Sequence, residues 1–405
     1  MNTSTPRPPA TALLILAYLA FVSLGLPDAV LGVAWPSLRD TFQLPQALLG
    51  APLAVGAATY FFSGLLAGKL ITRVGIGLLL AASTALVSAG VLGFAAAPAF
   101  FVILLVTPFM GFGSGAIDAA LNTYAARNFS PRHMSWLHAA YALGATTGPA
   151  IMTSVLSRGA SWRVGYAVVG FSLAALALAF TVAKRRWDAG QPATEVVVDA
   201  PGNVGPVQQD SPPVGTWSAL RSGRVWLQIA IFFFYTGIEV SAGQWSYTIL
   251  KEGRGLSAPA AGTWVAVYWG GLLAGRLVLG FVVERVGTVR MLRLAMLGAL
   301  LSAAFFAIPG LSFGAIALPL LSFSLASIYP GLMAETPRRV GEQTAPHAVG
   351  FQVSAATLGV AVLPSLAGIA SERFGLDAIG PVIAFCALMI FILHERLVAI
   401  ADTKA

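Results

Sequence analysis

Long apolar runs with almost no charge divide the chain, and they limit its possible folds more than any other feature. Of the 405 residues, 57% are hydrophobic and 10% are charged, whereas soluble domains carry about 25% charged residues. So few charges cannot cover a surface that faces water. The runs reach the ~20 residues that a helix needs to cross a bilayer, and they lack the alternating polarity of membrane strands. The sequence therefore predicts an all-α integral membrane protein.

About twelve runs of this kind follow one another along the chain. They begin near residues 11, 47, 77, 99, 135 and 161, and then near 225, 262, 289, 311, 345 and 376. Between the sixth and the seventh lies a segment rich in Pro, Gly and polar residues, which reads as a linker. We expect an N-terminal six-helix bundle over residues 1–183, a cytoplasmic linker over 184–224 and a C-terminal six-helix bundle over 225–405.

The basic residues predict the orientation of these helices. If the N-terminus is inside, the inner segments hold 17 of the 24 Lys and Arg residues, and the outer loops hold six. Because cytoplasmic loops of membrane proteins are enriched in Lys and Arg, both termini are expected in the cytoplasm. The expected location is the plasma (inner) membrane, which the chain crosses many times.

Patterns for other chemistries are weak. The basic residues are scattered at the ends of apolar runs, so nucleic acid is not an expected partner. The single cysteine, Cys386, excludes a disulfide framework and a cysteine-based metal site. No His-x-x-x-His motif and no phosphate-binding Gly-Lys-Ser/Thr motif occurs. We therefore expect no enzyme activity, no ATP-driven pump, no metal and no cofactor.

The two halves of the chain repeat each other. The segment GLLAGKLITRVG (64–75) follows the second run's core, and GLLAGRLVLGFVVERVG (271–287) follows the corresponding core of the second half. Likewise, LGATTGP (143–149) matches LGVAVLP (358–364) with the same Gly-to-Pro spacing. Two pseudo-symmetric bundles with a site between them near the bilayer midplane are a common arrangement in transporters.

On these residues the chain resembles the major facilitator superfamily of transporters over its whole length. The superfamily's loop motif, Gly-x-x-x-Asp-Arg-x-Gly, appears as GKLITRVG (68–75), with Thr72 in the acidic position. The second copy, GFVVERVGTVR (280–290), keeps an acid at Glu284. In the family these loops latch the cytoplasmic side, so the resemblance implies gating roles for Arg73 and Glu284.

More narrowly, the sequence is similar to fucose permease-like sugar–proton symporters. The segment GSGAIDAALNTY resembles their fourth-helix signature, with Asp118 at the acidic position and Asn122 at the Asn. The resemblance extends to FYTGIEVSAGQWSYTIL (234–250) and ASIYPGLMAE (326–335), and it places the family's sugar ligands of the fifth helix on His138 and Tyr141. In the first helix the family's acidic position is Gly32, and Asp28 lies one turn earlier.

Asp118 is the first candidate for a proton-coupling site. It lies nine residues before Arg127, which ends the fourth run, and at 1.5 Å per residue this is ~13 Å from the inner end, close to the middle of the bilayer. A carboxyl group there costs at least ~3 kcal/mol unless it is paired or neutral. The alternative is a permanently paired acid that fixes two helices together.

The other charged residues inside runs have several possible roles. Glu239 is a second proton site, a substrate ligand or a structural partner of Arg276. Asp28 couples protons or gates the outer mouth, unless it is only a hydrated group there. Arg276 lies eight residues, or ~12 Å, before Glu284, and its match to Lys69 in the repeat favours a cytoplasmic latch.

Polar and aromatic side chains in the apolar runs are candidates for binding a substrate. The apolar face of a sugar stacks on aromatic rings, whereas the alternative for each residue is packing or a place in the interfacial aromatic belt. The substrate-binding candidates are Asn122, His138, Tyr141, Gln244, Trp245, Tyr268 and Gln352.

The preferred hypothesis is a monomeric secondary transporter that moves a small polar, sugar-like solute by proton-coupled alternating access. Its partners are then the solute, protons and the lipid bilayer. The first alternative is a drug/proton antiporter, which requires an apolar, acid-lined cavity. The second is a non-transporting membrane sensor, although the ~40-residue linker is too short for a folded sensory domain.

Overall fold

The computed structural model describes residues 11–129, 131–188, 219–309, 314–341 and 343–402. Nearly all of them are helical, and the described part of the chain contains no strand. The first half consists of α1 (Thr11–Asp28), α2 (Val30–Phe42), η1 (Gln46–Leu49), α3 (Gly50–Ala96), α4 (Phe100–Asn128), α5 (Pro131–Ser157) and α6 (Trp162–Asp188). The all-α prediction is confirmed.

The second half has the same kind of architecture. It consists of α8 (Gly223–Thr248), η2 (Ile249–Gly253), α9 (Ala258–Val286), α10 (Thr288–Phe306), η3 (Gly314–Ile316), α11 (Ala317–Leu325), α12 (Ile328–Val340), α13 (Ala345–Phe374), η4 (Leu376–Ala378) and α14 (Ile379–Asp402). The start of each long helix lies within a few residues of a predicted run.

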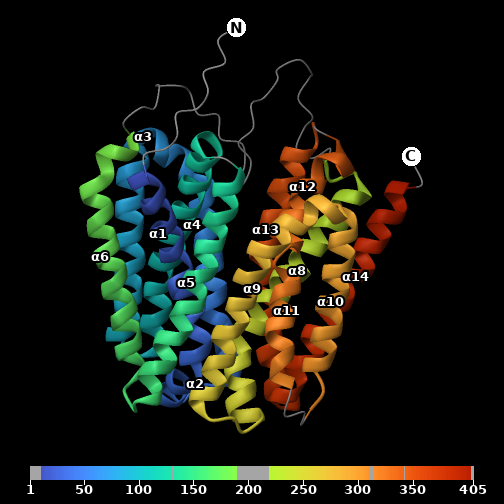
Figure 1. Cartoon of the computed structure of the whole chain (residues 1–405). Coiled ribbons are helices and arrows are strands. Elements are labelled where there is room, and N and C mark those ends of the chain that lie inside the picture. The colour runs from blue at the N-terminus through green and yellow to red at the C-terminus, as the bar shows by residue number, and fades with distance from the viewer. Residues whose placement is uncertain (1–10, 130, 189–218, 310–313, 342, 403–405) are drawn as a thin grey trace.

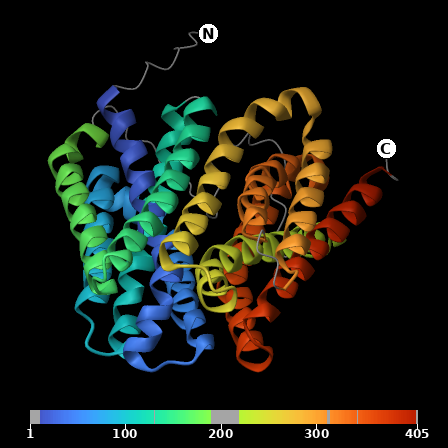
Figure 2. The same ribbon diagram turned by 60° about the horizontal axis from the view of Figure 1, so that its bottom comes forward.

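The helices form two groups, α1–α6 and α8–α14, which stand side by side with α5 next to α9 (Figure 1 and Figure 2). Helix α1 begins and α14 ends at the same end of the molecule (Figure 1), which we call the terminal end; the opposite end is the distal end. Helix α6 continues to Asp188 and α8 begins at Gly223, so both extend into the expected linker. Residues 189–218 of that linker lie outside the described residues.

Helix α3 contains two antiparallel arms. At Gly75 the backbone has φ 76° and ψ 161°, a conformation that glycine adopts without steric cost. In the first arm, Gly111 of α4 lies against Gly56 and Gly115 lies against Tyr60, so this arm runs parallel to α4. In the second arm, Gly93 lies against Val106 of α4 whereas Ser83 lies against Gly113, so this arm runs antiparallel to α4.

The described chain crosses the molecule twelve times. Nine described segments are long and apolar enough to span a membrane, and one of them, Gln46–Ala96, contains the two arms of α3. Helices α5 and α9, which are not among these nine segments, also extend between the two ends of the molecule (Figure 1). Together with the second arm of α3, they complete the twelve crossings. The outer surface of the two groups carries many exposed large apolar side chains, including Phe171, Val182 and Phe281, as lipid-facing helices do.

The internal repeat seen in the sequence is also a structural repeat. Gly75 and Gly287, at the end of the two matching segments, both have a positive φ, 76° and 81° respectively. Gly144 of α5 lies against the Val22 carbonyl of α1, and Gly359 of α13 lies against the Phe233 carbonyl of α8. In each half, therefore, a glycine of the fifth crossing allows close approach to the first crossing.

Candidate functional site

Asp28 lies where the first membrane crossing is interrupted. Helix α1 contains Pro27 and ends at Asp28, and α2 begins at Val30; a proline inside a helix removes one backbone hydrogen bond and favours such a break. The Tyr141 hydroxyl of α5 donates to Asp28 Oδ2 at 3.0 Å. Asp28 is exposed although it lies within a spanning segment.

Asp118 is held by two donors within the first half. The Tyr60 hydroxyl of α3 donates to Oδ2 at 2.7 Å, and Asn122 Nδ2 donates to Oδ1 at 2.9 Å. Both of these donors are neutral groups. Because neutral donors offset only part of the cost of a charge in the membrane, Asp118 is suited to exchange a proton.

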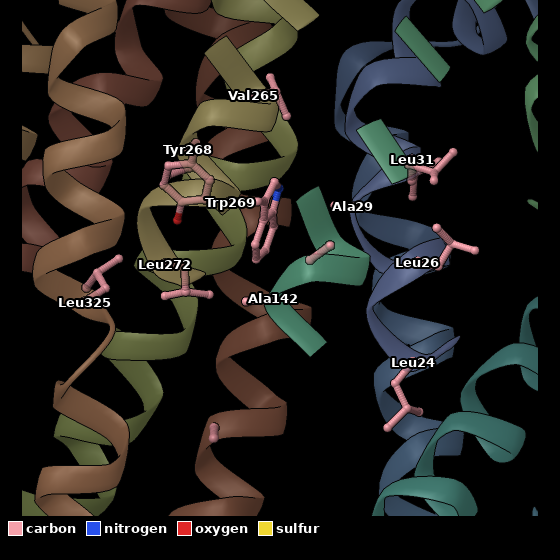
Figure 3. Packing of buried hydrophobic residues seen from close by; sticks show 14 of the residues in the cluster. Leu24, Leu26, Ala29, Leu31, Ala142, Val265, Tyr268, Trp269, Leu272 and Leu325 are labelled. Atoms are coloured by element: carbon pink, nitrogen blue, oxygen red, sulfur yellow. The ribbon is translucent and has the colours of Figure 1, made fainter. Parts of the chain in front are cut away.

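Glu239 is the carboxylate that the second half contributes, from α8. The Tyr235 hydroxyl, one helical turn earlier in α8, donates to its carboxyl group. The Tyr268 hydroxyl of α9 donates to the Glu239 carbonyl oxygen at 2.8 Å. Figure 3 shows Tyr268 and Trp269 on neighbouring positions of α9, where they pack among buried apolar side chains.

Arg276 connects the two halves at the level of these acids. Its Nη1 donates to the carbonyl oxygen of His138 in α5 at 2.9 Å. Its guanidinium carbon lies 5.6 Å from the centre of the Tyr141 ring, within the range of a cation–π interaction. Through Tyr141, Arg276 of the second half is linked to Asp28 of the first.

These groups form one cluster, which we call the central cluster. It consists of the charged residues Asp28, Asp118, Glu239 and Arg276 and of four tyrosines, Tyr60, Tyr141, Tyr235 and Tyr329. Asp28 and Asp118 are close enough to interact electrostatically, and Tyr329 of α12 interacts in this way with Asp118, Glu239 and Arg276. The cluster holds three carboxyl groups and one guanidinium, so full ionisation leaves an excess of negative charge. Protonation removes that excess without a further cation.

The two halves also contact each other between the central cluster and the distal end. Gln244 Nε2 of α8 donates to the Asp28 carbonyl oxygen at 2.8 Å, and a Cβ on Gly32 of α2 would lie 2.6 Å from the Gln244 carbonyl oxygen. The Gln244 Oε1 atom is buried without a hydrogen-bond partner. A buried acceptor without a partner costs free energy, so this contact between the halves carries an energetic cost at Gln244.

At the distal end itself, ionic contacts join the halves. Arg39 of α2 makes two hydrogen bonds to Glu252 of η2, at 3.0 and 3.3 Å. Gln46 Nε2 also donates to Glu252, at 3.3 Å, and the Ala47 backbone N–H donates to Glu372 of α13 at 2.9 Å. In this structure the halves are therefore bound together at the distal end.

We expect Glu252→Gln to weaken this distal contact without abolishing it. The Arg39 and Glu252 side chains are 19% and 25% exposed, and partly exposed ion pairs contribute about 0.2–1 kcal/mol. The population with an open distal end should therefore rise by no more than about fivefold. Distances between spin labels on Ser157 of α5 and Arg373 of α13, measured in a Cys386→Ser background, would show the shift; a double-mutant cycle with Arg39→Gln isolates the pair.

Several predicted substrate ligands lie at the central cluster. Asn122 and Tyr141 bind its carboxylates, as described above. His138 is exposed, and its ring lies 5.5 Å from that of Phe21 in an edge-on contact. Gln244 borders the cluster through its bond to Asp28. Tyr268 also borders it, but its side chain is fully buried.

Two predicted substrate ligands lie elsewhere. Trp245 is fully buried, its Nε1 donates to the Pro364 carbonyl oxygen at 3.0 Å, and Gly368 of α13 lies against its ring. Gln352 of α13 is also fully buried and donates to Gln228 at 2.9 Å. Both side chains are used in holding α13 to α8, which is a packing role.

The predicted gating residues are separated in space. Arg276 contacts the first half at the central cluster, whereas Arg73 is exposed in the last turn of the first arm of α3. Glu284 belongs to α9, but its side chain lies outside the described part of the structure. Gly275 of the GLLAG repeat lies close to α11, because a Cβ at this position would be 2.5 Å from that of Ala326.

Three tyrosines of the central cluster were not predicted from the sequence. Tyr235 lies four residues before Glu239, a spacing that places two side chains on one helical face, so its bond to Glu239 had a local signal. Tyr60 bonds to Asp118, which is 58 residues away. Only the fold brings Tyr60 and Tyr329 to the site.

Comparison with known protein families agrees with the fold. The model of the Major Facilitator Superfamily matches residues 17–364 and, in a second match, residues 229–402. The chain therefore belongs to the Major Facilitator Superfamily: it is a multi-pass membrane protein of a transporter family.

Two curated relatives match at low identity. Bypass of stop codon protein 6 from Saccharomyces cerevisiae is 25% identical over 285 residues, which are 67% of this chain and 57% of that protein. A Helicobacter pylori protein named "Putative glucose/galactose transporter" is 23% identical over 167 residues, 41% of this chain and 40% of that protein. The matches thus span only about half the length of these relatives.

Solved structures of transporters share the fold. The fucose transporter FucP in its outward conformation has 16% identity and a TM-score of 0.64, covering 95% of this chain and 98% of FucP. A mutant of the nucleoside transporter NupG has 14% identity and a TM-score of 0.73, with coverages of 96% and 99%. A bacterial homologue of the lysosomal transporter Spinster has 14% identity and a TM-score of 0.74, with 98% of both chains covered.

Proposed function

We propose that this protein is a proton-coupled secondary transporter of a small polar, sugar-like solute. The observation that carries the proposal is the central cluster. It brings three carboxyl groups, Asp28, Asp118 and Glu239, to the level of one arginine, and the groups come from both halves. Carboxyl groups inside a membrane that are bound by neutral donors are suited to take up and release protons.

The groups around the carboxylates favour a polar solute. Asn122, the exposed His138 and the cluster tyrosines offer amide, imidazole and hydroxyl groups within a short distance of one another. Such donors and acceptors match the hydroxyl groups of a sugar, and tyrosine rings match its apolar face. The names of two similar proteins, a fucose:proton symporter and a glucose/galactose transporter, support the same class of solute.

The distal contacts supply a mechanism of alternating access. Movement of a solute requires that the halves separate at one end while they close at the other. Opening the distal end must break the contacts of Gly32, Arg39 and Glu252 described above. Protonation or solute binding at the central cluster shifts the equilibrium between the open and closed distal end if it stabilises one state more than the other. Arg276 belongs to the second half and bonds to His138 of the first, so it is suited to respond to such a change.

We further propose that the terminal end faces the cytoplasm and that a monomer works in the plasma (inner) membrane. The charge count along the sequence supports this orientation. Single cysteines at Arg221 and at Arg158, in a Cys386→Ser background, test it. A membrane-impermeant thiol reagent added to whole cells should label Arg158→Cys at the distal end and leave Arg221→Cys unlabelled; the reverse labelling would overturn the orientation.

Drug/proton antiport is the second candidate function, and one observation favours it. A cavity of about 450 Å³ between α1, α5 and α9 is lined by apolar side chains, including Ile15, Leu19, Leu273 and Leu277. An apolar cation would find such a surface favourable. However, the described residues of this lining include no carboxylate, so the acid-lined cavity that antiport requires would have to combine this surface with the central cluster.

A binding screen followed by exchange measurements tests the proposed function. Sugars, organic acids and lipophilic cations are added to the purified protein, and those that raise its melting temperature are carried forward. In liposomes preloaded with such a solute, labelled solute outside should enter by counterflow. Entry of a sugar supports the proposal, stabilisation and exchange of lipophilic cations alone supports antiport, and binding without exchange supports a non-transporting sensor.

A further inference from the structure

A second polar cavity lies at the terminal end of the second half, away from the central cluster. Its volume is about 590 Å³. It is formed where α8 begins and where α12 and α14 end, and its lining residues are Arg221, Ser222, Gly223, Arg224, Arg338, Arg339, Val340, Gly341 and Ile400. Among the residues that the structure describes, the lining thus contains four arginines and no carboxylate. We call it the arginine cavity.

The beginning of α8 adds to the positive potential of this cavity. Ser222 is the residue before the helix, with an extended backbone, and its side chain makes no capping hydrogen bond. The first backbone N–H groups of a helix have no partner within it and carry the positive end of the helix dipole. An anion in the cavity would meet both this helix end and the arginines.

The arginines are held in place but are only partly neutralised. Arg224 donates to the carbonyl oxygens of Arg339 and Ile400, at 3.0 Å each, which fixes its position between the ends of α12 and α14. Arg339 is 6% exposed, and its Nη1 is buried without a hydrogen-bond partner. Arg338 pairs with Glu335 at 3.4 Å, but its side chain is 79% exposed, so this pair neutralises little charge.

The surroundings of the cavity have the features of a membrane interface. Trp226, in the first turn of α8, is 55% exposed, and its indole N–H donates to the Leu220 carbonyl oxygen at 2.8 Å. Exposed tryptophans with a satisfied N–H are typical of the headgroup level of a bilayer. Ile400, which lines the cavity, is 42% exposed and provides apolar surface beside the charges.

We propose that the arginine cavity binds the phosphate group of an anionic phospholipid headgroup. Guanidinium groups bind phosphate oxygens through paired hydrogen bonds, and basic pockets between membrane helices select anionic headgroups. The neighbouring Trp226 and Ile400 favour a lipid over a soluble phosphate compound, because they offer contact to the glycerol and the acyl chains. This inference does not depend on the transported solute.

Thermal unfolding of the whole purified protein tests this site. Short-chain phosphatidylglycerol should raise the melting temperature, whereas phosphatidylcholine with the same chains and glycerol 3-phosphate should have little effect. The double variant Arg221→Glu with Arg338→Glu should bind phosphatidylglycerol about tenfold or more weakly. These two residues are chosen because Arg224 bonds to the helix ends and Arg339 is buried, so the loss of either of those would disturb the fold.

A matched control changes the same number of charges at the same end. Arg185→Glu with Arg186→Glu alters two exposed arginines at the end of α6 and should retain the full effect of phosphatidylglycerol. If the Glu double variant does not fold, the corresponding Gln double variant replaces it. An unchanged affinity in the folded double variant would overturn the site, and equal stabilisation by glycerol 3-phosphate would overturn the lipid as its ligand.

Discussion

Asp118→Asn is expected to abolish the accumulation of solute that a pH gradient drives, while exchange of solute across the membrane continues. Asparagine has nearly the shape of a protonated aspartic acid but cannot release a proton. The Tyr60 hydroxyl and the Asn122 amide, which bind Asp118 at 2.7 and 2.9 Å, can still form hydrogen bonds to the new side chain. The binding geometry should therefore survive, and only the coupling should be lost.

Uptake into proteoliposomes with an alkaline interior measures the effect. Accumulation by Asp118→Asn should fall to the level of vesicles without protein, with counterflow retained. Glu335→Gln is the matched control, because Glu335 is another buried carboxylate of a membrane helix but pairs with Arg338 outside the central cluster. It should retain accumulation. Uphill accumulation by Asp118→Asn would contradict its role, and loss of folding would indicate a structural role.

Gly32→Val should have the second large effect and should prevent closure of the distal end. In the closed structure a Cβ at Gly32 would lie 2.6 Å from the carbonyl oxygen and 2.7 Å from the Cα of Gln244. Backbone atoms of a packed helix cannot move aside cheaply, so the two halves must stay apart. We expect transport to be abolished, because the cycle requires that this end closes.

Distances between spin labels on Ser157 and Arg373 should then move to a single long population. Gly270→Val is the matched control, since a Cβ at Gly270 of α9 meets nothing within 4 Å, and it should leave both the distances and the transport unchanged. If Gly32→Val retains the short distance and normal transport, the close approach of α2 and α8 is not part of the cycle.

The membrane crossings were predictable because their signal is local. A run of ~20 apolar residues has few alternatives in a chain with so few charges, and the structure begins its helices close to the predicted positions. The repeat was also readable, since Gly75 and Gly287 end matching segments and both adopt a positive φ. The break between Asp28 and Val30 has a local cause in the preceding Pro27.

The candidate site was predictable only in part, because pairing depends on the fold. The charged groups stood out in apolar runs, so Asp118, Glu239 and Arg276 were found from the sequence. The partners of these groups were not found: Tyr60 is one of nine tyrosines and has no local relation to Asp118. The roles of Trp245 and Gln352 were equally hidden, because a buried contact to α13 cannot be distinguished from a ligand by residue type.

Solute-driven proton entry is the measurement that shows whether solute and protons move together. Proteoliposomes that contain a pH-sensitive dye and no imposed gradient receive a solute identified by the binding screen. If transport is proton-coupled, the interior should acidify when a sugar-like solute enters, and a protonophore should remove the signal. Vesicles with Asp118→Asn should exchange the solute without acidification. Entry of the solute into wild-type vesicles with no change of internal pH would contradict proton-coupled transport.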